Sequence, residues 1–148
     1  MKKKPKLTDL LVRDLFAVDF DKGFAETIAS LSSIELSQQV FGEILRDRFK
    51  SRIRTIICFH DNRIVGTASC FIEKKFLHNG GMVMHVEDVA VHKDFQKMGV
   101  GRKLMEFLEA YAVEQKCYKI ILDCNKQNIP FYKKCGYLVH ETEMRKNL

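Results

Sequence analysis

The sequence predicts a single α/β (α+β) domain, built on a mixed sheet with helices packed on its faces. Short apolar or alternating segments predict strands, whereas segments with apolar residues three and four positions apart predict amphipathic helices. In chain order these segments give β-α-α-β-β-β-α-β-α-β, with no internal repeat and no linker. The chain has 148 residues, of which 46% are hydrophobic, so one domain over residues 1–148 can enclose a substantial core.

The first third of the chain predicts one strand and two helices. The apolar segment 10–15 predicts the first strand. Asp19 or Asp21 is expected to cap a helix that ends near Leu31. Ser37 is expected to begin the second helix, whose apolar side comprises Val40, Phe41, Ile44, Leu45 and Phe49.

The middle of the chain predicts a hairpin followed by a basic loop. Segments 54–60 and 64–73 are apolar and rich in β-branched residues, and Asp61-Asn62-Arg63 between them is a turn signal. Segment 74–81 carries lysines and a histidine and ends in two glycines, so we expect a loop there.

The next strand contains a change of phase. Met82, Met84 and Val86 alternate in one phase, whereas Val89 and Val91 alternate in the other. Side chains alternate strictly along a strand, so a shift of one position implies an inserted residue. We therefore predict a β-bulge at Glu87-Asp88, which bends the strand and releases nearby backbone groups from the ladder.

The last third predicts two helices and two strands. A helix starts at Gly101 and ends near Lys116, and segment 118–124 is an apolar strand. A short helix over 128–135 is expected to stop at Gly136, and a final strand is expected over 137–145.

The start of the helix at Gly101 predicts a phosphate site. Gly99 and Gly101 allow the backbone to approach a ligand closely, and the first turn of a helix carries unpaired N–H groups at the positive end of the helix dipole. Such a turn accepts phosphate oxygens. The residues expected to contribute are Lys97, Met98, Gly99, Val100, Gly101 and Arg102.

Composition argues against several functional classes. No apolar segment approaches the roughly 20 residues that a membrane-spanning helix needs. The net charge is +6, which favours small phosphorylated ligands, and four lysines fall in the basic tail expected over residues 1–6. No nucleic-acid-binding motif accompanies that charge.

The cysteines and histidines predict no metal site. The five cysteines form no Cys-x-x-Cys pair and show no zinc-ligand spacing with the histidines, so reduced thiols are expected. We expect an intracellular protein, in the cytoplasm or another reducing compartment.

Several motifs resemble the GNAT superfamily of N-acetyltransferases. Gln96-Lys97-Met98-Gly99-Val100-Gly101 resembles the superfamily signature Gln/Arg-x-x-Gly-x-Gly/Ala, and a bulged strand precedes it. The block from Asn128 to Tyr137, with Phe131-Tyr132 at its centre, resembles the segment that follows. Segments 75–78, 85–91 and 117–124 look like the glucosamine-6-phosphate N-acetyltransferase branch.

The resemblance implies a GNAT fold, a twisted sheet whose central strand splays away from its neighbour. Acetyl-CoA would then lie in the opening, with its pantetheine arm along Val89, Ala90 and Val91 and its pyrophosphate on the predicted turn. Asn128 matches a further position for this cosubstrate, and no metal is implied. Tyr132 occupies the position of the tyrosine that protonates the leaving thiolate.

The acceptor implied by the resemblance is glucosamine 6-phosphate, whose amine would attack the thioester directly, without an acyl-enzyme. Asp88 is favoured for contact with the substrate and Glu87 for a backbone carbonyl role, although this acidic pair also fits a solvated strand end. Cys124 and Cys135 have no predicted histidine partner, which argues against an acetylated cysteine. The substrate positions are Ser32, Lys75, Phe76, Leu77, His78, Glu87, Asp88, Val89, Tyr118, Lys119, Asp123 and Arg145.

The resemblance also implies a homodimer in which the C-terminal strand crosses to the second subunit and Arg145 or Lys146 reaches its phosphate pocket. Two alternatives stay open. The acceptor is another amine, such as a protein, a polyamine or a different amino sugar, or the chain is a non-catalytic acyl-CoA-binding module. The basic loop disfavours polyamines because like charges repel.

Overall fold

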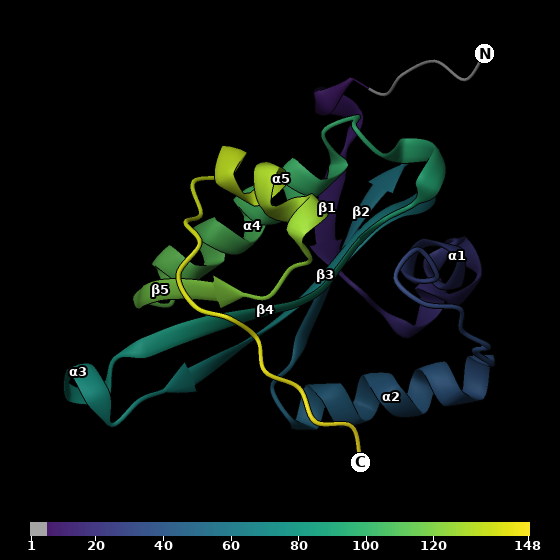
Figure 1. The fold of residues 1–148 in the computed structure, drawn as a ribbon. Coiled ribbons are helices and arrows are strands. Elements are labelled where there is room, and N and C mark those ends of the chain that lie inside the picture. The colour runs from purple at the N-terminus through teal and green to yellow at the C-terminus, as the bar shows by residue number, and fades with distance from the viewer. Residues whose placement is uncertain (1–5) are drawn as a thin grey trace.

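A computed structural model describes residues 6–148, so the basic tail expected over residues 1–6 lies outside the described residues except for Lys6. The domain is one mixed sheet in the order β1-β2-β3-β4-β5, antiparallel except for the parallel pair β4 and β5 (Figure 1). The strands are β1 (Leu11–Asp14), β2 (Arg54–His60), β3 (Arg63–Lys74), β4 (Met82–Val91) and β5 (Cys117–Leu122).

Helices cover both faces of the sheet, as predicted. The α-helices are α1 (Phe24–Ile28), α2 (Gln38–Lys50), α3 (Leu77–Gly80), α4 (Val100–Glu114) and α5 (Ile129–Lys134). The 3-10 turns are η1 (Leu7–Asp9), η2 (Ala17–Lys22), η3 (Lys93–Phe95) and η4 (Lys126–Asn128). In Figure 1, α4 and α5 lie on one side of the sheet, and α1 and α2 lie on the other.

Strand alternation divides the core into two layers. Ile56 packs with Leu104 and Leu108 of α4, whereas its neighbour Ile57 packs with Phe41 of α2. All five of these residues have little or no exposed surface. The central strands are therefore apolar on both faces, which explains why β2 and β3 read as continuous apolar segments.

The bulge predicted in β4 is confirmed. Ser69 pairs with Glu87 and Thr67 pairs with Ala90, so one residue of β3 faces two residues of β4. Asp88 takes a left-handed conformation with φ 49°, which is uncommon for a residue with a side chain and is typical of a bulge.

The helix predicted from Asp19 or Asp21 to Leu31 was wrong as a single element. The chain forms η2 and then α1, and Gly23 separates them with φ 91°. Neither aspartate is the N-cap residue of a helix, since Phe16 holds that position before η2 and Gly23 holds it before α1. The Asp19 carboxylate is fully buried, where it accepts the Phe16 N–H at 3.0 Å and pairs with Arg13.

The final strand predicted over residues 137–145 was also wrong for the isolated chain. Residues 137–148 have no regular secondary structure, and none of the five strands pairs with them. Alternating apolar residues form a strand only where a neighbouring strand supplies hydrogen-bond partners. Leu138, Val139 and Met144 are correspondingly exposed.

The predicted basic loop 74–81 contains one short helical turn, α3. His78 and Asn79 have positive φ values there, and Lys75 N–H donates to the Gly81 carbonyl at 2.8 Å to close the loop. Among the described residues, no helix is long and apolar enough to cross a bilayer.

We expect Asp19→Asn to lower the free energy of unfolding by about 2–4 kcal/mol at pH 7, because it leaves Arg13 without its buried carboxylate. Hydrogen bonds from Arg13 hold the pKa of Asp19 at about 2, against an ordinary value near 3.8. A depressed folded-state pKa stabilises the protein above the unfolded pKa, and this stabilisation is lost as the pH falls toward 2.

Urea unfolding at several pH values measures this effect. The difference between the wild-type protein and Asp19→Asn should shrink as the pH falls from 4 to 2. Asp21→Asn in the same turn is the control, because Asp21 is exposed and its replacement should change stability by less than about 0.5 kcal/mol. Equal stabilities of the two variants at pH 7 would contradict the assignment.

Candidate active site

Strands β4 and β5 separate at the bulge. Their parallel pairing runs from Met82 and Cys117 to Val86 and Leu122, where it ends. Beyond this point, residues 87–91 have no β5 partner, although Ala90 and Val91 still pair with β3. One backbone edge of β4 is thus open over residues 87–91 to an extended ligand that adds itself like a strand.

The predicted phosphate turn follows β4 and the short η3 turn. Lys97 has φ 61° and Gly99 has φ 86°, so two left-handed residues turn the chain into α4. The first bond of the helix runs from Lys103 N–H to Gly99 O. The N–H groups of Val100, Gly101 and Arg102 precede that bond, and they lie at the positive end of a 15-residue helix.

Helix α5 packs against this turn. A Cβ atom on Gly101 would lie 3.0 Å from Phe131 Cζ, so a glycine permits the close approach of the two helices. Met98 is half-buried beside the turn, whereas Asn128 is exposed at the start of α5. Arg102 is exposed and its Nε lies 3.0 Å from Glu106 Oε1.

Tyr132 of α5 is almost fully buried, and its ring contacts those of Phe131 and Tyr137. Burial raises the pKa of its phenol to about 12, and the nearby Cys124 and Cys135 thiols add to the shift. Cys124 follows the end of β5, where the two strands separate. The phenol therefore keeps its proton at neutral pH and lies close to the opening.

The bulge brings three carboxylates together. Val86 and Val89 both pack on the core beneath α4, so Glu87 and Asp88 between them face the other side of the sheet. Burial raises the pKa of Glu87, and the charges of Asp88 and Asp123 raise it further. Asp123 was predicted to lie beside the substrate, and its influence on Glu87 indicates that the fold brings the two residues close.

Cationic and aromatic residues gather at the other end of this face. The rings of His78 and Tyr118 lie 4.4 Å apart, and Lys119 Nζ lies 5.6 Å from the centre of the Tyr118 ring. A Cβ atom on Gly81 would lie 2.8 Å from the Tyr118 ring, so Gly81 lets α3 approach β5. The fold therefore assembles a cation group, which we define as Lys75, His78 and Lys119 with Tyr118.

Two residues that the sequence analysis missed hold this group in place. Glu73 accepts from Lys75 Nζ at 2.9 Å, and His85 Nε2 lies 2.8 Å from the second oxygen of Glu73. The His85 ring stacks on Phe71 at 4.5 Å. Strand alternation was the available signal, since Glu73 and His85 are near neighbours on one face of the predicted β3–β4 hairpin.

The acids and the cation group lie at opposite ends of one sheet face. Ile120 and Leu122 of β5 pack toward α4, which directs Lys119 and Asp123 to the other side. Asp123 lies four positions after Lys119, which corresponds to about 13 Å along an extended chain. An acceptor with an amine at one end and a phosphate at the other matches this arrangement.

The remaining predicted positions lie at the periphery. Phe76 and Leu77 of the α3 loop are exposed. Arg145 is exposed and binds Glu143, and Glu143 in turn lies close enough to raise the pKa of Glu87. The C-terminal segment of this chain thus passes the acids rather than the cation group, and the sequence carried no signal for the approach of Glu143.

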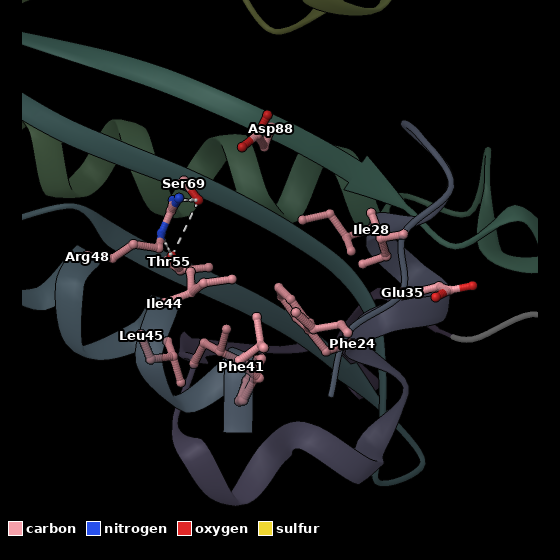
Figure 2. Close-up of a pocket in the computed structure, with 14 residues that line it drawn as sticks. Phe24, Ile28, Glu35, Phe41, Ile44, Leu45, Arg48, Thr55, Ser69 and Asp88 are labelled. Atoms are coloured by element: carbon pink, nitrogen blue, oxygen red, sulfur yellow. Dashed lines mark hydrogen bonds between the residues drawn. The ribbon is translucent and has the colours of Figure 1, made fainter. Parts of the chain in front are cut away.

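A cavity of about 330 Å³ opens beside the bulge on the same face as the acids (Figure 2). Apolar residues of α1, α2 and the loop between them line it, and Asp88 lies at one end. Ser32 is exposed in that loop, two residues before Ile34 of the cavity wall. The sequence analysis did not predict this cavity, since it forms only when α2 packs over the bulged sheet.

Among the described residues, no group of three or more His, Cys, Asp or Glu is placed to hold a metal ion. The site combines the open edge of β4, the unpaired N–H groups at the start of α4, the phenol of Tyr132 and a cluster of carboxylates. These are the parts that the resemblance to the GNAT superfamily implied.

Comparison with known proteins agrees with this geometry. The model of the Acetyltransferase (GNAT) family matches residues 10–137. A glucosamine 6-phosphate N-acetyltransferase of Candida albicans is 36% identical over 89% of this chain and 91% of its own length. One of Arabidopsis thaliana is 34% identical over 91% of this chain and 94% of its own.

A solved structure gives the same result. The crystal structure of glucosamine-6-phosphate N-acetyltransferase from Arabidopsis thaliana matches with a TM-score of 0.88 and 32% identity, covering 93% of this chain and 97% of that one. The predicted fold class is thereby confirmed. A match of the family model over most of the chain, with this fold, shows that the chain belongs to the GNAT family of acetyltransferases.

Proposed function

We propose that this protein transfers the acetyl group of acetyl-CoA to the amine of glucosamine 6-phosphate, which yields N-acetylglucosamine 6-phosphate for amino-sugar synthesis. The relatives that cover most of the chain carry this activity in their names. The observation that carries the proposal is the pairing of a carboxylate cluster at the bulge with the cation group on the same sheet face.

Acetyl-CoA would lie in the opening between β4 and β5. The open edge of β4 offers backbone partners at Val89 and Val91 to its pantetheine amides. The N–H groups at the start of α4 suit its pyrophosphate, and Lys97 adds positive charge. The thioester supplies an activated acetyl group, so no metal and no acyl-enzyme is required.

Glu87 would remove a proton from the acceptor amine. Its carboxylate has a raised pKa, because it is partly buried beside Asp88 and Asp123, and a carboxylate with a raised pKa is a stronger base. This role differs from the backbone role first expected for Glu87. Asp88 and Asp123 would hold the amine and the sugar hydroxyls.

Tyr132 would donate its proton to the sulfur as the carbon–sulfur bond breaks. A phenol that stays protonated at neutral pH can donate a hydrogen bond or a proton to a thiolate. Burial raises the pKa of the Cys135 thiol, which disfavours this cysteine as the nucleophile and supports direct attack by the amine.

The cation group would bind the phosphate, and a second copy of the chain would complete the site. Residues 137–148 lack a strand partner and expose Leu138, Val139 and Met144. Tyr118 and Ile121 are exposed on the edge strand β5. Exposed apolar residues beside a free sheet edge suit a homodimer with exchange of the C-terminal strand, which would bring Arg145 to the second subunit.

We also propose a reducing intracellular compartment such as the cytoplasm. All five cysteines are free, and Cys58 and Cys70 are buried with their pKa values raised to about 11. Buried thiols of this kind behave as small apolar residues and are typical of reduced proteins.

Release of free thiol from acetyl-CoA tests the proposed acceptor. We expect kcat/KM to be at least about tenfold higher with glucosamine 6-phosphate than with glucosamine, because each charge-assisted contact to phosphate contributes about 1.5–3 kcal/mol. Inorganic phosphate added to the glucosamine reaction controls for ionic strength. Equal kcat/KM values for the two sugars would contradict the proposal that the protein recognises the phosphate of its acceptor.

A further inference from the structure

We propose that the cavity beside the bulge gives this protein a second class of acceptor: primary amines that carry an apolar substituent. The amine would lie at Asp88 and the substituent would lie in the cavity beneath α2. This inference rests on acetyl transfer by the family and is independent of the sugar acceptor.

The cavity is built for an apolar group. Its walls comprise Leu15, Phe24, Ile28, Ile34, Leu36, Val40, Phe41, Ile44 and Leu45. Its volume of about 330 Å³ lies within the range of small-molecule sites. Figure 2 shows Phe24, Phe41 and Ile44 around the interior, with Asp88 at the end nearest β4. A hexose phosphate has no group that would gain from this apolar lining.

The charges at the cavity favour a cation over an anion. The lining contains two carboxylates, Asp88 and Glu35, and one guanidinium, Arg48. Arg48 already donates to Thr55 Oγ1 at 3.1 Å and to Ser69 Oγ at 2.5 Å, as the dashed lines in Figure 2 show. A protonated amine would therefore find its carboxylate partner at Asp88.

The cavity also leads to the reacting groups. Asp88 is the residue inserted at the bulge, and Glu87 is the partner of Ser69 at the last regular pair before it. An amine held at Asp88 consequently lies beside the opening in which the thioester is expected. Acceptors can thus extend from the bulge in two directions, toward the cation group or into the cavity.

The reaction is the same as for an amino sugar. The amine nitrogen forms a bond to the thioester carbonyl carbon, and the carbon–sulfur bond breaks. The nitrogen loses its extra proton to Glu87, and the thiolate receives one from Tyr132. The products are the N-acetylated amine and free coenzyme A, so no oxidant or further reactant is needed.

A series of straight-chain amines from propylamine to hexylamine tests the proposal on the unmodified protein. Thiol release is measured at pH 8.5, since alkylamines have pKa values near that of lysine, about 10.4, and react in the neutral form. Burial of each added methylene should raise kcat/KM about fourfold. A flat series, or no acetylated hexylamine by mass spectrometry, would overturn the proposal.

Hexanoate tests whether the cavity prefers a cationic or an anionic ligand. It matches the amine in its alkyl chain and bears a carboxylate that only Arg48 could bind in the cavity. We expect no inhibition of hexylamine acetylation by hexanoate at equal concentration. Inhibition of hexylamine acetylation by hexanoate would show that the cavity takes anions and would overturn the proposal.

Ile44→Trp places an indole ring in the cavity. Ile44 is 43% exposed, so its replacement need not disturb the core. We expect kcat/KM for hexylamine to fall more than tenfold while kcat/KM for glucosamine 6-phosphate is retained. Val113→Trp on the outer side of α4, at a residue 72% exposed, should change neither value.

These results separate this inference from the proposed function. Failure with alkylamines alone removes the second acceptor class and leaves the sugar acceptor in place. Failure with glucosamine 6-phosphate alone removes the proposed function and leaves the cavity assignment. An equal loss of both activities in Ile44→Trp, with an unchanged unfolding temperature, would contradict a separate cavity for apolar amines.

Discussion

Replacement of Tyr132 by phenylalanine should lower kcat by about 10²–10⁴-fold while the affinity for acetyl-CoA stays within about twofold, because the change removes only the proton donor for the leaving thiolate. Tyr132 is almost fully buried between Phe131 and Tyr137. The phenylalanine ring keeps these contacts, so the fold should persist. A discontinuous assay of thiol release measures kcat, and equilibrium binding of coenzyme A measures the affinity.

Tyr137→Phe is the matched control. Tyr137 is half-buried, and burial likewise raises its pKa to about 12, but it lies beyond α5 and is not expected to reach the thioester. This variant should keep kcat within about threefold. Wild-type turnover in Tyr132→Phe would contradict the leaving-group role, and a large loss in both variants would point to packing instead.

Replacement of Lys75 by alanine should raise KM for glucosamine 6-phosphate and leave kcat nearly unchanged. A charge-assisted hydrogen bond to phosphate contributes about 1.5–3 kcal/mol, which corresponds to about 10- to 150-fold in kcat/KM. In the structure, Lys75 Nζ lies 2.9 Å from Glu73 Oε1. Because the phosphate must compete with Glu73 for the ammonium, part of the binding free energy from the phosphate contact is offset.

The unphosphorylated sugar makes this prediction specific. Lys75→Ala should not change kcat/KM for glucosamine, because that substrate has no phosphate to lose. Lys133→Ala in α5 is the second control, since we expect this lysine to be inert. A fall in kcat for both sugars would show that Lys75 supports the structure of the loop rather than the phosphate.

The sequence predicted the local features of the site. The phase change between Val86 and Val89 predicted the bulge, because side-chain alternation permits no other explanation in a continuous strand. Gly99 predicted the turn into α4, since it takes a left-handed conformation there. Both features depend on neighbouring residues alone, and the structure confirms both.

The errors have a common cause. Asp19 looked like a helix cap, but its carboxylate is buried with Arg13 from β1, a partner that the local sequence does not reveal. The segment 137–145 looked like a strand, but a strand requires a partner, and the isolated chain offers none. In each case a contact between distant segments, or its absence, decided the outcome.

The sequence by itself determined the order of the central elements, the bulge, the glycine turn that begins α4 and the residue types at the site. Only the tertiary structure decided that Glu87 and Asp123 influence each other, that Glu73 holds Lys75, and that α2 leaves a cavity beside Asp88. The physical reason is the distance along the chain over which each interaction acts. Backbone conformation follows from a few neighbouring residues, whereas pKa shifts, ion pairs and cavities depend on which segments the whole fold brings into contact.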